Sequence, residues 1–277
     1  MKGLVLKKNA GLFEVESEKG LCNIKALGNV KKSGLYVGDE VEFDGVITKV
    51  YPRRNRLIRP PLANLSRLFI VIASTPKPDY VLVDKLLLYC YVSGIEPTIV
   101  VNKADIFDNN FEKEVKSIYN KVVPIIFTSA QKCELGKLRN EIKGVCAFAG
   151  QSAVGKSSLI NALLGGTQAE VGGLSRKVER GKQTTRMTSL YKLENGYIAD
   201  TAGFSLLDAA LVLPIEPHEL SKYYPDFLES LKDCKFRSCT HETAGNCAVI
   251  EAVKKGLVNS TRYNNYLKIL SEIKEAK

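Results

Sequence analysis

The sequence predicts a multidomain chain with an OB-type β-barrel at the N-terminus, an α/β domain in the centre and a helical, zinc-binding domain at the C-terminus. Short alternating segments separated by turn residues fill residues 1–62, as in a small barrel. Strand-like and helical segments alternate through residues 63–208 around a glycine-rich loop, which predicts a parallel sheet covered by helices. Clustered cysteines and a histidine lie within residues 209–277. We place the domain boundaries at these positions.

The composition is that of a globular protein, since 45% of the 277 residues are hydrophobic. The formal charge of +10 favours a polyanionic partner such as RNA, although charge spread evenly for solubility would give the same total. No apolar run is long enough to span a bilayer, and residues 1–8 lack a signal-peptide pattern. We expect a cytoplasmic protein that has no membrane partner and acts as a monomer.

The N-terminal segments with strand character are residues 3–6, 12–16, 20–24, 41–43 and 46–51. Their number and length fit a five-stranded OB-type barrel, a fold that often binds nucleic acids. A basic cluster of Arg53, Arg54, Arg56 and Arg59 follows the last of them. The cluster is either an RNA contact or a charged linker, and no aromatic-rich stacking motif in the sequence decides between the two.

The central domain begins with a buried-strand pattern at residues 65–74, a helical pattern at 79–92 and a second strand at 96–101. The second strand ends at the tetrapeptide Asn102-Lys103-Ala104-Asp105. A carboxylate at Asp105 can accept hydrogen bonds from N1–H and the exocyclic amino group of guanine, a pair that adenine lacks. The tetrapeptide alone would equally suit an ordinary loop.

The other residues of this region complete a guanine site. Asn102 would hold the purine edge and the neighbouring loops, and the stem of Lys103 would lie along the base. A further strand at residues 125–127 leads into a loop that contains Ser129 and Ala130, and the N–H of Ala130 could reach guanine O6.

A phosphate-binding loop follows the apolar strand at residues 145–149 and precedes a helical pattern. Its residues fit G-x-x-x-x-G-K-[ST]: Gly150, Gln151, Ser152, Ala153, Val154, Gly155, Lys156 and Ser157, with Ser158 next in the helix. The glycines let the backbone approach a polyphosphate, and the N–H groups at the helix N-terminus face it. Lys156 would neutralise the β and γ oxygens, and Ser157 would bind Mg²⁺.

Two later segments have the character of nucleotide-dependent switches. Adjacent Thr184 and Thr185 follow a polar, glycine-containing stretch, and either could close over Mg²⁺ and the γ-phosphate, with Thr185 preferred. A strand then ends at Asp200, and Gly203 completes an Asp-x-x-Gly sequence. Asp200 would hold Mg²⁺ through water, and the N–H of Gly203 would sense the γ-phosphate.

These motifs match those of GTPases, but base recognition precedes the phosphate loop and the switches come last, which is a circular permutation. With a barrel before it and a Cys/His cluster after it, the chain resembles the bacterial ribosome small-subunit-dependent GTPase A family. The resemblance implies hydrolysis of GTP to GDP with Mg²⁺, stimulation by the small ribosomal subunit and its rRNA, and a role in late subunit maturation. The alternatives are an RNA-binding assembly factor that uses GTP only as a conformational switch, and an ATP-using P-loop enzyme.

One position departs from that family's pattern. The family has histidine before the two threonines, where this chain has Gln183, and Phe204 stands where many GTPases have a water-orienting glutamine. Gln183 can donate and accept hydrogen bonds but cannot carry a proton near neutral pH. We hypothesise that Gln183 orients the attacking water, beside catalytic contributions from Lys156, Thr185 and Gly203.

Three cysteines and a histidine near the C-terminus have the spacing of a metal site: Cys234, Cys239, His241 and Cys247. Three thiolates and one imidazole suit tetrahedral Zn²⁺ with no open position, hence a structural site. The odd total of seven cysteines argues against a disulfide framework. The helical unit around the site is either a contact for RNA or ribosomal protein, or a cap that stabilises the central domain.

Overall fold

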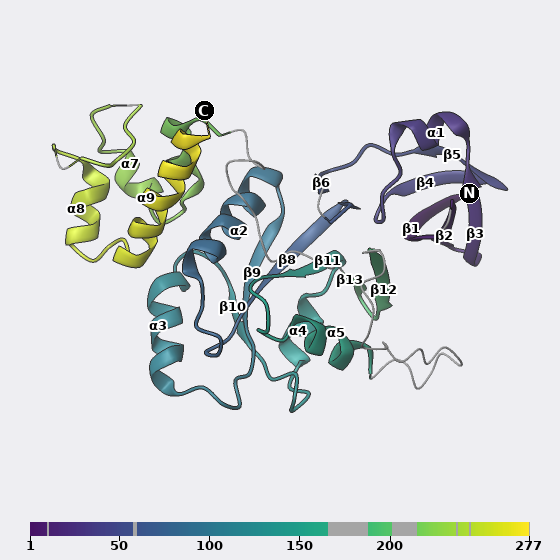
Figure 1. Ribbon diagram of the computed structural model, residues 1–277, viewed down its shortest axis with the longest axis horizontal. Coiled ribbons are helices and arrows are strands. Elements are labelled where there is room, and N and C mark those ends of the chain that lie inside the picture. Colours follow the sequence, from purple (N-terminus) through teal and green to yellow (C-terminus); the bar gives the residue numbers. More distant parts are fainter. Residues whose placement is uncertain are drawn as a thin grey trace. The chain divides into compact units, whose positions relative to one another are not determined.

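The computed structural model describes residues 1–9, 11–57, 60–165, 188–200, 215–236, 238–243 and 245–276 (Figure 1). The chain divides into two compact units that each combine segments distant in the sequence. The first unit contains Met1–Phe69, Ser129–Phe148 and Gly155–Phe204, and the second contains Ile70–Thr128, Ala149–Val154 and Ser205–Lys277. Among the described residues, no helix combines the length and apolar character needed to cross a bilayer.

The first unit opens with five strands: β1 (Lys2–Asn9), β2 (Leu12–Ser17), β3 (Gly20–Ala26), β4 (Glu40–Asp44) and β5 (Val46–Val50). Their order is β1-β2-β3-β5-β4, and β4 pairs back with β1, so the strands close into a barrel. Alternating side chains such as Val5, Val15 and Phe43 point inward and are buried. The helix α1 (Gly28–Ser33) connects β3 to β4. The closed barrel confirms the fold predicted for this region.

The α/β part of the first unit adds β8 (Leu65–Ile72), β11 (Gly144–Ala149), β12 (Ser189–Leu193) and β13 (Gly196–Asp200), with the helices α4 (Gly136–Glu141) and α5 (Lys156–Leu164). The strand order is β8-β11-β13-β12, and β12 pairs with the barrel strand β1. β11 is almost wholly buried and runs parallel to β13, as its unbroken apolar sequence predicts for a central strand. The short strands β6 (Arg56–Leu57) and β7 (Leu62–Ala63) pair with each other.

The second unit contains the end of β8 and the strands β9 (Glu96–Val101) and β10 (Ile125–Phe127). Their order in the sheet is β10-β9-β8, and β9 and β10 are parallel. Two capped helices accompany these strands, α2 (Tyr80–Ser93) and α3 (Asn109–Tyr119). Asp79 caps α2 by accepting a hydrogen bond from the Leu82 N–H, and Asp108 caps α3 in the same way at the Phe111 N–H. The caps explain why both helices begin directly after an aspartate.

The C-terminal part of the second unit is helical: η1 (Pro217–Tyr223), α7 (Leu228–Leu231), α8 (Ala248–Lys254) and α9 (Ser260–Glu275). The buried side of α9 includes Tyr266, Leu270 and Ile273, which recur at helical spacing. α9 packs against α2, and the loop between α7 and α8 carries the clustered cysteines.

Candidate functional site

The phosphate loop has a backbone that only particular residues can adopt. Gly150 has φ +127°, and a Cβ at this position would lie 2.3 Å from the carbonyl oxygen of Val71. Ala153 and Gly155 also have left-handed backbones, with φ 64° and 97°. Alternation of right- and left-handed residues turns successive N–H groups toward one side, which forms an anion-binding concavity. The loop geometry therefore fits a bound polyphosphate.

The loop leads into α5, whose first residue is Lys156 and whose N-cap is Gly155. Ser157 and Ser158 follow in the first turn and are exposed. The first N–H groups of a helix have no partner within the helix and carry a partial positive charge. Burial lowers the pKa of the half-buried Lys156 ammonium, because removal from water disfavours the charged form. A bound anion would relieve that penalty.

Two residues predicted to recognise the base contact the phosphate loop within the second unit. The buried side-chain amide of Asn102 donates a hydrogen bond of 2.9 Å to the carbonyl of Val154. The Lys103 ammonium donates to the carbonyls of Ala153 at 3.0 Å and Thr75 at 2.8 Å. Lys103 has a left-handed backbone with φ 63°, and the chain turns directly after it, beyond the end of β9. The two predicted motifs are thus physically joined.

Asp105 lies in the turn after β9 and is partly buried. The turn is held by the Ala104 N–H, which donates to the Thr128 carbonyl at 3.0 Å, and by the Thr128 N–H, which donates to the Val101 carbonyl at 2.9 Å. In the first unit, the buried Ser129 accepts a hydrogen bond from the Lys132 N–H through its hydroxyl at 3.1 Å, and Ala130 is partly buried. Backbone pairing thus ties the Asp105 turn to the end of β10.

The structure gives Gln151 a contact that the sequence did not indicate. Its Oε1 accepts from the Asp79 N–H at 3.1 Å, and its Nε2 donates to the Lys77 carbonyl at 3.2 Å. Residues 77–79 immediately precede α2, so these two hydrogen bonds join the phosphate loop to the start of this helix. The contact joins positions far apart in the sequence, and neither Lys77 nor Asp79 belongs to a recognisable motif.

Asp200 is the exposed last residue of β13, and the loss of water around its carboxyl to neighbouring protein groups raises the pKa of that carboxyl. Thr184, Thr185, Gln183 and Gly203 lie outside the residues that the structure describes. Their predicted roles therefore remain predictions.

Three of the four predicted zinc ligands converge. The ligand atoms of Cys234, His241 and Cys247 all lie within 4.8 Å of one another. Nδ1 of His241 is 3.3 Å from the Cys247 sulfur and 3.7 Å from the Cys234 sulfur. Bonds of about 2.3 Å to sulfur and about 2.0–2.1 Å to nitrogen in a tetrahedral site place those atoms about 3.6 Å apart. The cluster is therefore the right size for a metal such as Zn²⁺.

The remaining predicted ligand, Cys239, is not in that converging group. Its sulfur instead accepts a hydrogen bond from the His241 N–H at 3.3 Å. Two tyrosines of α9 hold the same loop, because Tyr263 donates to the His241 carbonyl at 2.7 Å and Tyr266 to the Thr240 carbonyl at 2.9 Å. The loop is thus anchored on α9 on one side of the cluster.

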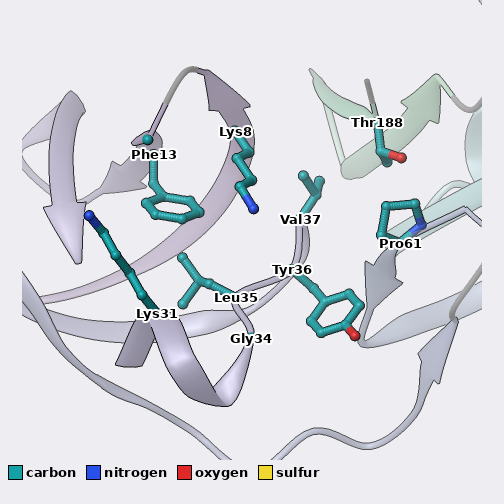
Figure 2. Close-up of a pocket in the computed structure, with 10 residues that line it drawn as sticks. Lys8, Phe13, Lys31, Gly34, Leu35, Tyr36, Val37, Pro61 and Thr188 are labelled. Carbon is teal, nitrogen blue, oxygen red and sulfur yellow. The ribbon is translucent and has the colours of Figure 1, made fainter. Parts of the chain in front are cut away.

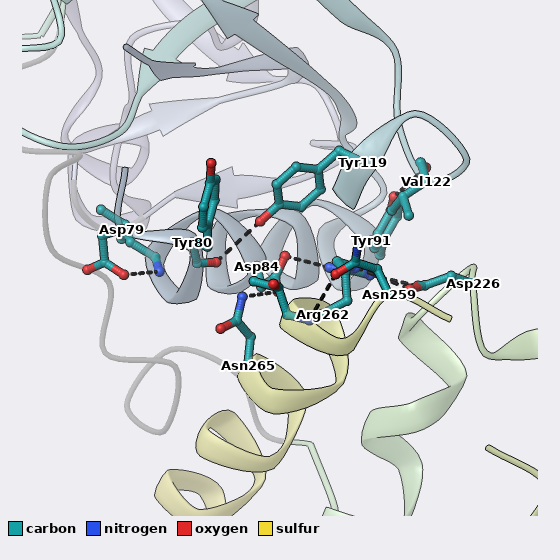
Figure 3. Close-up of polar contacts among 12 residues, drawn as sticks. Asp79, Tyr80, Asp84, Tyr91, Tyr119, Val122, Asp226, Asn259, Arg262 and Asn265 are labelled. Carbon is teal, nitrogen blue, oxygen red and sulfur yellow. Dashed lines mark hydrogen bonds and ion pairs between the residues drawn. The ribbon is translucent and has the colours of Figure 1, made fainter. Parts of the chain in front are cut away.

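A buried ionic network fastens α9 to α2 (Figure 3). Arg262 of α9 pairs with Asp84 of α2, and its Nη2 lies 2.8 Å from an oxygen of Asp226. Asn265 donates to the other Asp84 oxygen at 2.8 Å. Arg262 and Asp84 are 1% and 0% exposed in their side chains, so the pair has no access to water. α2 therefore touches the phosphate loop at its start and the C-terminal module along its length.

Comparisons with known proteins agree with this arrangement. The RsgA GTPase family model matches residues 50–210. The small ribosomal subunit biogenesis GTPase RsgA of Halalkalibacterium halodurans is 36% identical over 288 residues, covering 99% of this chain and 97% of that protein. The protein of the same name from Streptococcus pneumoniae is 36% identical over 283 residues, covering 99% and 94%.

Two solved structures share the fold. YjeQ from Thermotoga maritima has a TM-score of 0.81 and 30% identity, with 98% of each chain covered. YloQ, described as a circularly permuted GTPase, has a TM-score of 0.79 and 27% identity, with 100% of this chain and 96% of that chain covered. The family model matches residues 50–210, and the relatives align along nearly the whole of this chain. The chain therefore belongs to the RsgA GTPase family and is a GTP hydrolase with a circularly permuted fold.

Proposed function

We propose that the chain hydrolyses GTP to GDP and phosphate when the small ribosomal subunit activates it, and that it acts late in the maturation of that subunit. The named role of its relatives in small ribosomal subunit biogenesis supports this partner. The same role supports a cytoplasmic protein, and we propose that it acts as a monomer. The single observation that best supports the nucleotide site is that Asn102 and Lys103, predicted to recognise the base, bond to the phosphate loop. Their partners there are the carbonyls of Val154 and Ala153.

Each site residue then has a chemical task. Asp105 reads the guanine edge, with Ser129 and Ala130 completing the base pocket. The N–H groups of residues 150–158 and the Lys156 ammonium hold the phosphates and balance the charge that develops during transfer. Gln183 orients the attacking water, and the N–H of Gly203 contacts the γ-phosphate.

The donor set also suits two metals. Ser157, Thr185 and Asp200 would hold Mg²⁺, which neutralises phosphate charge when it is bound with GTP. Cys234, Cys239, His241 and Cys247 would hold one structural Zn²⁺. For Cys239 this requires its sulfur to move toward the other three ligands, since it lies outside their converging group.

Guanine recognition is tested with Asp105→Asn. An amide at this position can still accept from the N1–H of a purine but repels the exocyclic amino group of guanine, whereas it can donate to the O2 carbonyl of xanthine. We expect GTP affinity to fall by about 100-fold and XTP binding to appear, because an unsatisfied polar contact in a base site costs about 1–3 kcal/mol or more. Asp44→Asn on the barrel strand β4 is the control. Unchanged GTP preference in Asp105→Asn would remove this residue from base recognition.

Activation is tested by measuring GTP turnover with and without purified small subunits. We expect slow turnover by the isolated chain and a rise of at least tenfold with subunits. Fast turnover by the isolated chain, or no response to subunits, would contradict the proposal. A non-hydrolysable GTP analogue separates the alternatives: a factor that only switches conformation would release from subunits with the analogue as readily as with GTP.

A further inference from the structure

The second half of the phosphate loop has its carbonyl groups bound by side chains of the same unit. Lys103 donates to the Ala153 carbonyl at 3.0 Å, and the buried amide of Asn102 donates to the Val154 carbonyl at 2.9 Å. In a trans peptide the carbonyl and the N–H that follows it point in opposite directions. The two bonds therefore turn the next two N–H groups, those of residues 154 and 155, toward the opposite side of the loop, where they can bind a phosphate.

The first half of the loop is held differently, through the side chain of Gln151. Its Oε1 accepts a hydrogen bond from the Asp79 N–H at 3.1 Å, and its Nε2 donates to the Lys77 carbonyl at 3.2 Å. A primary amide presents an acceptor and a donor side by side, so Gln151 pairs with the backbone of residues 77–79 as a peptide group of a neighbouring strand would. Exchange of the amide oxygen and nitrogen would set donor against donor and acceptor against acceptor. The pairing therefore fixes the orientation of the amide as well as its position.

The segment that Gln151 contacts is itself held in place. Asp79 is the N-cap of α2 (Figure 3), and its carboxylate accepts a hydrogen bond from the Leu82 N–H at 3.0 Å. Further along α2, the buried pair of Asp84 and Arg262 joins this helix to α9. Gln151 therefore attaches the phosphate loop to a helix end that the rest of the second unit fixes.

The hollow in Figure 2 belongs to the first unit and does not shape the phosphate loop. Its volume is about 680 Å³, and it is lined by barrel residues such as Lys8 and Phe13, together with Pro61 and Thr188. Residues 149–154, which include most of the phosphate loop, belong to the second unit. The conformation of the loop therefore depends on hydrogen bonds within the second unit, of which those of Gln151 are the pair without an assigned function.

We propose that Gln151 is a positioning residue for the nucleotide phosphates, because its side chain holds the first half of the phosphate loop in the binding conformation before the nucleotide arrives. Without its two hydrogen bonds, only a fraction of the molecules has the loop in that conformation, and the apparent affinity falls by the same fraction. A bound nucleotide restores the conformation, so the chemical step is unchanged. The inference rests on the proposed function for the location of the phosphate site.

The test variant is Gln151→Met, which keeps the length of the side chain and removes both hydrogen bonds. We expect the KM for GTP and the Kd for GDP to rise on the order of tenfold, as the loss of two hydrogen bonds at the protein surface implies. The kcat should stay the same, since a change that raises KM alone removes an interaction made equally in the ground state and the transition state. Steady-state turnover and titration with a fluorescent GDP analogue measure these constants.

Asn110→Met is the matched control, because it replaces an amide by methionine at an exposed position of the same unit, near the start of α3. It should change neither KM nor Kd. Wild-type KM and Kd in Gln151→Met would overturn the proposal, and so would a fall in kcat at unchanged KM or equal effects in the two variants.

A double-mutant cycle shows whether Gln151 acts through the start of α2. Asp79→Pro removes the N–H that bonds Gln151, and the φ of −85° at this position is close to that of proline. Asp79→Ala keeps the N–H and accounts for the lost helix cap. We expect Gln151→Met to weaken GDP binding much less in the Asp79→Pro background than in the Asp79→Ala background, since two changes that remove one shared contact are not additive. Additive effects in both backgrounds would overturn the proposal.

Lys156→Ala separates this inference from the proposed function, because it should lose GDP binding wherever Gln151 stands in the argument. Normal GDP binding by Lys156→Ala would overturn the phosphate site itself. Lost binding in Lys156→Ala together with wild-type affinity in Gln151→Met would overturn only the positioning role. The preference for GTP over XTP, expected to depend on Asp105, should remain intact in Gln151→Met. Its loss there would overturn the positioning role, since the substitution would then disturb the whole site and not the phosphate loop alone.

Discussion

The side-chain amide of Asn102 donates a 2.9 Å hydrogen bond to the carbonyl of Val154, although 52 residues separate the two in the chain. Asn102 follows β9, and Val154 lies in the phosphate loop that follows β11. In parallel sheets, loops at the carboxyl ends of strands build ligand sites. The bond couples the position of the segment predicted to read the base to the conformation of the predicted phosphate loop.

Replacement of Asn102 by alanine should therefore weaken both folding and nucleotide binding. A buried carbonyl at Val154 would lose its partner, which costs about 1–3 kcal/mol in the free energy of unfolding. Chemical denaturation and GDP titration measure the two effects. Asn110→Ala, at an exposed position near the start of α3, should change neither. Normal GDP affinity in Asn102→Ala would mean that the loop keeps its shape without this bond.

Gly150→Ala should be far more damaging than substitution of a glycine whose Cβ would meet open space. The new Cβ would lie 2.3 Å from the Val71 carbonyl oxygen in a backbone with φ +127°. Strain of this kind costs at least about 1–3 kcal/mol, and the loop must shift to relieve it. We expect a lower Tm and no measurable GTP binding. Gly136→Ala in α4 meets no atom within 4 Å and serves as the control. A Gly150→Ala protein that binds GTP normally would contradict the close approach.

Glu16 should give the unfolding free energy a dependence on pH. Burial raises the pKa of its carboxyl, but hydrogen bonds from Lys192 and Tyr197 outweigh burial and leave the pKa below its ordinary value of 4.5. A group with a lower pKa in the folded state stabilises the fold above its unfolded pKa, and this contribution is lost as pH falls through the folded pKa. The difference in Tm between the wild type and Glu16→Gln should thus be largest above about pH 5 and shrink in acid.

The contacts at Glu16 join the barrel strand β2 to β12 and β13, with the Lys192 ammonium at 2.6 Å and the Tyr197 hydroxyl at 2.5 Å. Glu18→Gln alters an exposed carboxylate in the same hairpin and serves as the control. A pH-independent Tm difference for Glu16→Gln would show that these hydrogen bonds contribute nothing through the charge of Glu16.

The purified chain should contain one zinc ion, and Cys247→Ser should lose it. Metal binding that requires the folded site adds directly to the free energy of folding, so Tm should fall with the metal. Elemental analysis and a thermal melt, each before and after chelation, measure this. Cys133→Ser, at an exposed cysteine outside the cluster, should retain zinc. Cys239→Ser decides the fourth ligand: retention of zinc in that variant would leave Cys239 only as a hydrogen-bond acceptor.

Arg262→Met should destabilise the second unit strongly. It leaves the Asp84 carboxylate fully buried without its cation, and breaking a buried pair from one side costs about 3–5 kcal/mol. Arg67→Met breaks a half-exposed pair with Glu141, for which the expected loss is at most about 1 kcal/mol. Denaturation curves of the two variants give the comparison. Similar losses in both would show that burial does not control the strength of the Arg262 network.

Features that depend on neighbouring residues can be predicted from the amino-acid sequence alone. The phosphate loop is one short segment that contains Gly150, Gly155, Lys156 and Ser157. Its chemistry can therefore be predicted without knowledge of the fold. The strands of the barrel alternate with period two, and the apolar run of β11 marks a strand buried on both faces. Local sequence patterns of this kind come directly from the geometry of the backbone.

Contacts between residues that are distant in the chain become known only from the folded structure. No sequence signature indicates that Gln151 accepts a hydrogen bond from the Asp79 N–H or that Arg262 pairs with both Asp84 and Asp226. The same is true of the guanidinium groups of Arg53 and Arg56, which lie over the Tyr36 ring. The basic cluster at residues 53–56 could not be told from a charged linker, because its aromatic partner Tyr36 stands at a different point of the chain. Such contacts depend on how strands and helices pack, and packing is set by side chains from the whole fold rather than by any one segment.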